Sequence, residues 1–146
     1  MTATFADSSA LVKLYADEPG AERVRSLRDV VVSELARVEV PAALWRKHRM
    51  GSLSAGLTAV LVNEFEADYL GTEVEQPRFL TVRLVPEILQ QAARLVAVHG
   101  LRAYDAVQLA SAVAVNAQVP ESVTFAAFDR RLCDAAAVEG LALIAA

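Results

Sequence analysis

Short apolar runs of β-type residues alternate along this chain with longer segments of helical periodicity. The short runs predict strands at residues 2–6, 30–33, 79–85, 122–126 and 141–144. The periodic segments predict helices at residues 10–15, 20–28, 34–48, 54–69, 87–99, 103–116 and 130–138. Because the two kinds of element alternate, we expect a three-layer α/β/α fold, in which helices cover both faces of a parallel sheet of about four or five strands.

Length and composition predict one compact domain over residues 1–146. Apolar residues make up 55% of the chain and charged residues 22%, a balance typical of globular proteins. The single cysteine, Cys133, allows neither an internal disulfide nor a cysteine-based zinc site. The first residues lack the basic start and apolar stretch of a signal peptide, and no apolar run approaches the roughly 20 residues that span a bilayer. We therefore expect a cytoplasmic protein without a membrane segment.

The net charge of −4 argues against a basic surface that coats nucleic acid through phosphate contacts alone. It does not exclude a nuclease, because bound metal ions require clustered carboxylates and reverse the local sign of the field. The positions of the acidic residues are therefore more informative than their sum.

Two acidic residues in the first third of the chain have both a structural and a chemical interpretation. Asp7 directly follows the first predicted strand, where it suits either the N-cap of a helix or a ligand-binding carboxylate at the end of a central strand. Glu39 lies about a turn and a half into the third predicted helix. It sits beside an apolar stripe at helical spacing, made of Leu35, Val38, Ala42 and Trp45. A surface salt bridge with Arg46 or Lys47 is the structural alternative for Glu39.

Two further acids lie near the starts of predicted helices in the last third of the chain. Asp105 precedes an almost wholly apolar helical segment, where an acid also complements the helix dipole. Asp129 follows the fourth predicted strand and also suits an N-cap. Segments that follow parallel strands emerge at one edge of the sheet, so we expect Asp7, Glu39, Asp105 and Asp129 to converge on one crevice. Close carboxylates repel one another unless a cation neutralises them, and their oxygens favour Mg²⁺ or Mn²⁺ over Zn²⁺. The set thus predicts a site where one or two divalent ions assist the hydrolysis of a phosphodiester.

The order of these motifs resembles the PIN-domain ribonucleases, and most closely their VapC toxin branch. The matching segments are DSSALVKLY beginning at Asp7, VEVPAAL around Glu39, LRAYDAVQLA around Asp105 and FDRRL around Asp129. The resemblance covers essentially the full chain, implies a PIN-like fold and places the acidic set of the family on these four residues.

Similarity to this family implies an endoribonuclease that uses Mg²⁺ or Mn²⁺ and cuts structured RNA such as tRNA or rRNA. It also implies a homodimer that is held inactive by a cognate VapB-type antitoxin, whose C-terminal segment covers the active-site groove. A PIN nuclease of RNA maturation and a non-catalytic PIN-like binding module remain open as alternatives. A phosphoacceptor signalling domain is disfavoured, since it would want a second acid beside Asp7, where this chain has Ser8 and Ser9.

The chain departs from the family pattern at two positions. Many relatives carry Ser or Thr two residues before the last acid, where this chain has Ala127, which puts the metal role of Asp129 in doubt. Pro41 falls inside the helix that carries Glu39 and is expected to kink it just past that residue.

Basic and aromatic residues close to the acids have two interpretations each. Arg102, Arg130 and Arg131 flank the acids, so they suit either contacts to RNA phosphates or salt bridges within the acid cluster. We expect Tyr104 to pack against the sheet rather than to stack on a base, and Lys13 to lie at the surface.

Overall fold

A five-stranded parallel sheet forms the centre of the computed structural model, which describes residues 2–144. Its strands are β1 (Thr4–Ala6), β2 (Val30–Ser33), β3 (Leu80–Val82), β4 (Thr124–Ala126) and β5 (Ala142–Leu143). They lie in the order β3-β2-β1-β4-β5, and every neighbouring pair is parallel. The predicted α/β fold with its parallel sheet is therefore confirmed. The order reverses at β1, so the segments that follow β1 and β4 open a crevice of the kind in which such sheets bind ligands.

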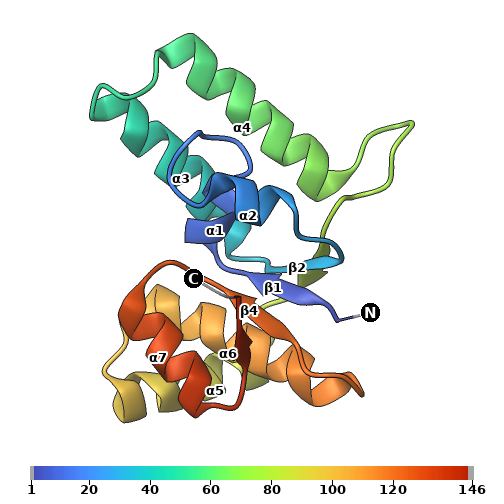
Figure 1. Cartoon of the computed structure of the whole chain (residues 1–146), viewed down its shortest axis with the longest axis vertical. Coiled ribbons are helices and arrows are strands. Elements are labelled where there is room, and N and C mark those ends of the chain that lie inside the picture. Colours follow the sequence, from blue (N-terminus) through green and yellow to red (C-terminus); the bar gives the residue numbers. More distant parts are fainter. Residues whose placement is uncertain (1, 145–146) are drawn as a thin grey trace.

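Helices cover both faces of this sheet (Figure 1). One layer holds α1 (Ser8–Val12), α2 (Ala21–Arg25), α3 (Ala36–Arg49) and α4 (Ala55–Leu70). The opposite layer holds α5 (Pro86–His99), α6 (Ala103–Gln118) and α7 (Arg130–Val138). Each layer has its own apolar core. Leu11, Leu44 and Phe65 belong to the core on the side of α1, α3 and α4, whereas Leu95, Leu109 and Leu132 belong to the core on the other side.

The helix that carries Glu39 buries a different face from the one predicted. α3 begins at Ala36, two residues later than expected, because the preceding residues form a turn in which Ser33 Oγ accepts a hydrogen bond from the Leu35 N–H at 3.1 Å. The predicted stripe is wrong, since Val38 is 68% exposed. The buried face consists instead of Ala36, Val40 and Leu44. Pro41 lies inside α3 without ending it, because the helix continues to Arg49.

Lys13, at the end of α1, is buried rather than at the surface as predicted, with only 8% of it exposed. Its Nζ donates hydrogen bonds to Glu18 Oε1 at 2.8 Å and to the Pro19 carbonyl at 2.7 Å. The same ammonium lies 4.4 Å from the centroid of the Phe128 ring, a cation–π contact. Lys47 of α3 forms an ion pair with the other oxygen of Glu18. These contacts tie the loop after α1 to α3 and to the loop that precedes α7.

Gly20, in the loop that Lys13 holds, is required by its backbone conformation and by its neighbour. Its φ is +91°, which L-residues rarely adopt, and a Cβ built there would lie 2.7 Å from Phe128 Cε1. We expect Gly20→Ala to lower the free energy of unfolding by about 1–2 kcal/mol in a denaturant titration. Gly56, in α4, is the matched control. Nothing lies within 4 Å of its Cβ position, so Gly56→Ala should raise stability by about 0.5–1 kcal/mol. Equal stability of the two variants would contradict this account of Gly20.

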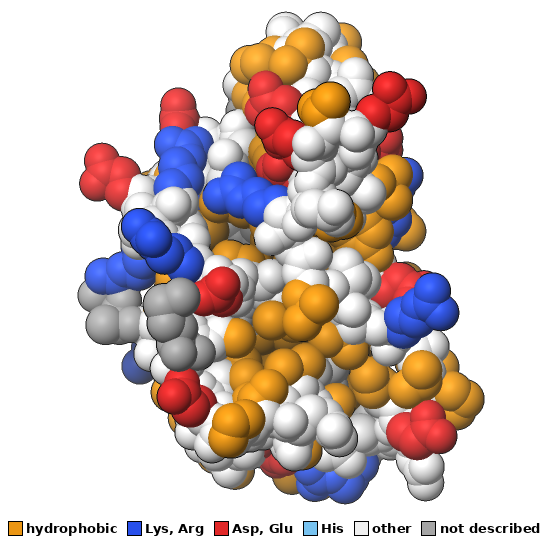
Figure 2. Space-filling view, turned by 90° about the vertical axis from the view of Figure 1, so that its right-hand side faces the viewer, with side chains coloured by type: hydrophobic (Ala, Val, Ile, Leu, Met, Phe, Trp, Pro, Cys, Tyr) orange, Lys and Arg blue, Asp and Glu red, His pale blue; other side chains and the backbone are white. Residues whose placement is uncertain are grey.

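The side of the molecule on the right of Figure 1 shows hydrophobic side chains gathered near its middle, with acidic and basic side chains around them (Figure 2). The charges on this face are of mixed sign rather than a continuous basic surface. Within residues 2–144, no helix combines the length and the apolar character needed to cross a bilayer.

Candidate active site

Asp7 lies at the junction of β1 and α1, and its side chain is almost completely buried. Its main-chain N–H donates to the Ala126 carbonyl at 3.0 Å, which fixes it beside the end of β4. The Oδ1 atom accepts hydrogen bonds from Ser9 Oγ at 2.7 Å and from the Ala10 N–H at 3.0 Å. Asp7 is therefore the N-cap of α1, and it explains why the helix begins at Ser8 rather than at residue 10.

The environment of Asp7 disfavours its charged form. Burial is the main cause and raises the pKa of this carboxyl from 3.8 to about 7, although the hydrogen bonds from Ser9 and Ala10 oppose the rise. The negative charges of Asp105 and Glu39 raise it further. Asp105 and Glu39 thus lie close enough to Asp7 to disfavour a negative charge on it. Within residues 2–144, no Lys or Arg forms an ion pair with Asp7 or Glu39.

Glu39 is oriented by two neighbours rather than by the predicted salt bridge with Arg46 or Lys47. Its Oε1 accepts a hydrogen bond from Ser8 Oγ at 2.7 Å and another from Gln108 Nε2 at 2.7 Å. These partners come from α1 and α6, so the acid on α3 is held at the meeting point of three helices.

Asp105 and Asp129 lie at the starts of α6 and α7 and share one basic neighbour. Arg102 Nε lies 3.4 Å from Asp105 Oδ2, and Arg102 Nη2 lies 4.0 Å from Asp129 Oδ2. Asp129 is the N-cap of α7, because its Oδ1 accepts the Leu132 N–H at 2.9 Å. Its side chain is 43% exposed, against 24% for the side chain of Asp105. The structure therefore places Glu39 and Asp105 near Asp7, while Asp129 lies at the margin and shares Arg102 with Asp105.

Three of these acids divide their oxygens in the same way. Within residues 2–144, one oxygen of Asp7, of Glu39 and of Asp129 accepts the hydrogen bonds, and the other oxygen accepts none. The occupied oxygen fixes the rotation of the carboxylate. The other oxygen of Asp7 and of Glu39 is left for a ligand, whereas that of Asp129 faces Arg102 at 4.0 Å.

The donor set fits a hard divalent cation. Carboxylate oxygens are the ligands that Mg²⁺ and Mn²⁺ prefer, and the crowding of negative charge around Asp7 is what such an ion would offset. As the side chains stand, no three His, Cys, Asp or Glu residues of the described chain lie close enough to hold one ion together. Mg²⁺ does not need three, because it is usually bound through one or two carboxylates and keeps several waters.

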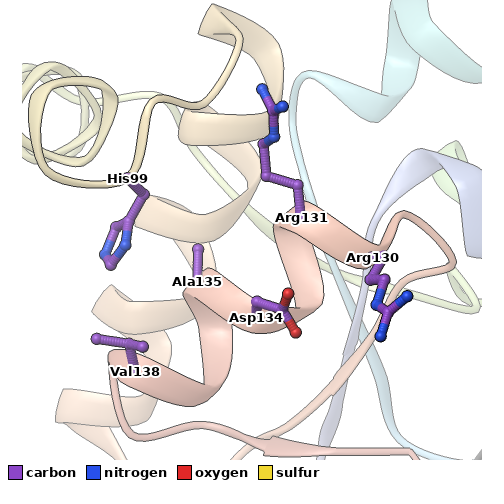
Figure 3. Close-up of a pocket in the computed structure, with 6 residues that line it drawn as sticks. All are labelled: His99, Arg130, Arg131, Asp134, Ala135 and Val138. Atoms are coloured by element: carbon purple, nitrogen blue, oxygen red, sulfur yellow. The ribbon is translucent and has the colours of Figure 1, made fainter.

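A pocket of about 440 Å³ lies along the exposed side of α7, the helix that Asp129 caps, and none of the four acids lines it. Figure 3 shows Arg130 and Arg131 projecting in different directions from the first turn of α7, with Asp134 one turn further on and His99 across the pocket. Neither arginine forms an ion pair within residues 2–144, in contrast to Arg102. Two guanidinium groups are therefore available within a few residues of Asp129.

Several residues of the site differ from the sequence-based expectations. Ser8, Ser9 and Gln108 were not predicted as site residues. Gln108 does give a signal in the sequence, since it is a polar residue within an almost wholly apolar helix, one turn after Asp105. Tyr104 was expected to pack against the sheet, but it is 64% exposed beside Asp105.

Comparison with known sequences finds one family over most of this chain. A family model for the PIN domain matches residues 4–138, a span that includes all four acids. Two curated relatives from Mycobacterium tuberculosis are each 34% identical over 136 residues, which cover 90% of this chain and 88% of the relative. They are Ribonuclease VapC45 of strain CDC 1551 / Oshkosh and Ribonuclease VapC49 of strain ATCC 25618 / H37Rv.

Two solved structures share the fold at low sequence identity. PAE2754 from Pyrobaculum aerophilum superposes with a TM-score of 0.60 at 20% identity and covers 97% of this chain and 83% of that one. A toxin–antitoxin complex from Klebsiella pneumoniae gives a TM-score of 0.56 at 14% identity, with 87% of each chain covered. At these identities the likeness concerns the fold alone.

Proposed function

The chain belongs to the PIN-domain family, in its VapC toxin branch, and from this membership we propose that it is a divalent-metal-dependent endoribonuclease. The proposal includes one PIN domain over residues 1–146. The names of the relatives support ribonuclease activity. The chemistry of the acid cluster supports the dependence on a metal ion, because Asp7 and Glu39 form no ion pair with a basic residue in the described part of the chain, and the one basic partner of Asp105 and Asp129 is the exposed Arg102.

Asp7 and Asp105 are the proposed first ligands of Mg²⁺ or Mn²⁺, with Glu39 beside them and Asp129 in a supporting role. A bound ion of this type lowers the pKa of water and stabilises the charge that develops on a phosphodiester during in-line attack. The protein itself holds the carboxylates still, through the hydrogen bonds that Ser8, Ser9, Ala10, Gln108 and Leu132 donate. Fixed ligands need little rearrangement during the reaction.

Basic and aromatic side chains beside the acids are the proposed RNA contacts. Arg130 and Arg131 are exposed and free of ion pairs among the described residues, so they can bind phosphates through forked hydrogen bonds. Arg102 is also exposed, and it can reach a phosphate while it remains near Asp105. Tyr104 offers an exposed ring for a base that is turned out of the strand.

We further propose structured RNA, tRNA or rRNA, as the substrate and a VapB-type antitoxin as the partner that covers the groove. A homodimer is the proposed assembly. A chain of the same fold in the solved toxin–antitoxin complex from Klebsiella pneumoniae supports a partner of this kind.

The single observation that carries the proposed function is the buried Asp7 carboxylate, whose pKa is raised by burial and by the nearby charges of Asp105 and Glu39. We expect purified protein to cut a mixed pool of tRNA and rRNA into discrete fragments with Mg²⁺ or Mn²⁺. The fragments should be absent with EDTA, which removes the metal ion, and with Asp105→Asn, which removes one of its proposed ligands. Circular dichroism of Asp105→Asn would establish that the variant is folded.

Fragments that persist in EDTA would overturn the metal dependence. No cleavage with any metal, by folded protein free of antitoxin, would favour a binding module over a nuclease.

A further inference from the structure

Gln108 links the two helical layers of the protein at the acid site. It lies on α6, one turn after Asp105, and only 2% of it is exposed. Its Nε2 donates to Ser8 Oγ on α1 at 3.0 Å and to Glu39 Oε1 on α3 at 2.7 Å. Ser8 Oγ in turn donates to the same Glu39 oxygen at 2.7 Å. The three side chains form a closed triangle whose members are 31, 69 and 100 residues apart in the sequence.

The pattern of donors and acceptors allows this triangle only one orientation of the amide. Gln108 Nε2 has two hydrogens, and both are used. A flipped amide would set its carbonyl oxygen against a carboxylate oxygen of Glu39, where both atoms are acceptors and repel each other. The observed orientation has a cost, because Gln108 Oε1 is buried without a hydrogen-bond partner among the described residues. The need to donate to Glu39 therefore takes precedence over the satisfaction of the amide oxygen.

The triangle also fixes which oxygen of Glu39 is available. Glu39 Oε1 accepts two hydrogen bonds, whereas Oε2 accepts none within residues 2–144. Rotation of the carboxylate away from this geometry would break both bonds and leave the buried amide of Gln108 without one of its acceptors. The amide of Gln108 thus holds Glu39 in a single rotation while Oε2 stays open.

We propose that Gln108 is a positioning residue for the nuclease reaction, which fixes the Glu39 carboxylate so that Oε2 is free to bind the divalent cation. This inference rests on the proposed function, because it assumes that the acids hold a metal ion. Residues that orient metal ligands in this way typically contribute about 10- to 100-fold to metal affinity or activity.

The test compares variants that keep or remove the donor at position 108. Gln108→Met preserves the length of the side chain and removes the donor. Gln108→His places a ring N–H at a similar reach. Ser111→Ala is the matched control, because Ser111 is a buried polar residue one turn later on α6 that contacts Ser33 and the Val107 carbonyl instead of Glu39. The readouts are Mn²⁺ affinity, from the electron paramagnetic resonance of free Mn²⁺, and kcat and KM for RNA cleavage.

We expect Gln108→Met to weaken Mn²⁺ binding and to lower kcat by about tenfold or more each, with KM little changed. Gln108→His should recover most of both losses, and Ser111→Ala should change neither. A folded Gln108→Met protein with wild-type Mn²⁺ affinity and kcat would overturn the proposal. If that variant does not fold, Gln108→Leu removes the same donor with a different apolar side chain, and wild-type Mn²⁺ affinity and kcat there would overturn the proposal equally.

Different results would overturn the proposed function and the role of Gln108. A wild-type protein that neither binds Mn²⁺ nor cuts RNA would overturn the proposed function, and the role of Gln108 with it. A wild-type protein that does both, beside variants that match it, would overturn the role of Gln108 alone.

Discussion

Asp7→Asn is expected to lower the rate of RNA cleavage by about a hundredfold or more while the protein stays folded. The expectation follows from the different roles of the two carboxylate oxygens of Asp7, because Oδ1 alone accepts hydrogen bonds from the described residues. The Asn carbonyl oxygen can replace Oδ1 as acceptor for Ser9 Oγ and the Ala10 N–H, so the cap of α1 is retained. An NH₂ group then replaces the free oxygen, which removes both the charge and a ligand for the cation. Single-turnover cleavage at saturating Mg²⁺ measures the loss, and a rate within threefold of wild type would contradict the role of Asp7.

The same substitution should raise stability, and the effect should depend on pH. Because burial raises the pKa of Asp7 to about 7 in the folded protein, against 3.8 for the free side chain, the folded state retains a proton that the unfolded state has lost between these values. The contribution of the protonated Asp7 carboxyl to the free energy of unfolding is therefore fully present below about pH 4. It is lost as pH rises toward about 7 and stays absent above that. The difference is on the order of a few kcal/mol. In EDTA, Asp7→Asn should match wild type at pH 4 and exceed it at pH 8. A gap that does not change with pH would contradict this explanation.

Phe125→Ala is expected to lower the free energy of unfolding by about 3–5 kcal/mol, a large part of the stability of a domain of this size. Phe125 lies on β4, is fully buried and stacks on Phe5 of β1 with 5.9 Å between ring centroids. Its removal leaves a cavity in the apolar core between the sheet and the layer of α5, α6 and α7. Urea denaturation followed by circular dichroism measures the loss.

Leu80→Ala is the control for Phe125→Ala, since Leu80 is exposed on the edge strand β3. Its substitution should change the free energy of unfolding by less than about 0.5 kcal/mol. Similar losses in the two variants would mean that burial does not govern the stability of this sheet.

The fold was largely predictable because its signals are local. Apolar strands alternate with helices, and this pattern alone predicts the parallel sheet. β3 was predicted to span residues 79–85 and is confined to Leu80–Val82, because it lies at the edge of the sheet and pairs with β2 alone. The phase of α3 was wrong for a related reason. Alanine and valine recur so often along this helix that more than one stripe fits the spacing, and only packing decides which one is buried.

The acids could be predicted as one set from the sequence because each lies just after a strand or in the first turns of a helix. The side chains that orient them could not, because those contacts join distant parts of the chain. Gln108 reaches Ser8 across 100 residues, and no local pattern encodes such a pair. The exposure of Lys13 and of Tyr104 was also predicted wrongly: Lys13 was expected at the surface and is buried, whereas Tyr104 was expected to pack against the sheet and is exposed. Burial of Lys13 depends on Glu18 and Phe128 closing over it, and exposure of Tyr104 depends on the helix beginning at Ala103.

The acid set is drawn equally from the two helical layers, and this makes activity sensitive to their relative position. Asp7 and Glu39 belong to the layer of α1 and α3, whereas Asp105 and Asp129 belong to the layer of α6 and α7. Each layer packs its own apolar core against one face of the shared sheet. A slide of a single layer would separate the pairs of carboxylates without unfolding the chain. The proposed metal site therefore depends on how the two helical layers are held against the sheet, and not only on the four acids themselves.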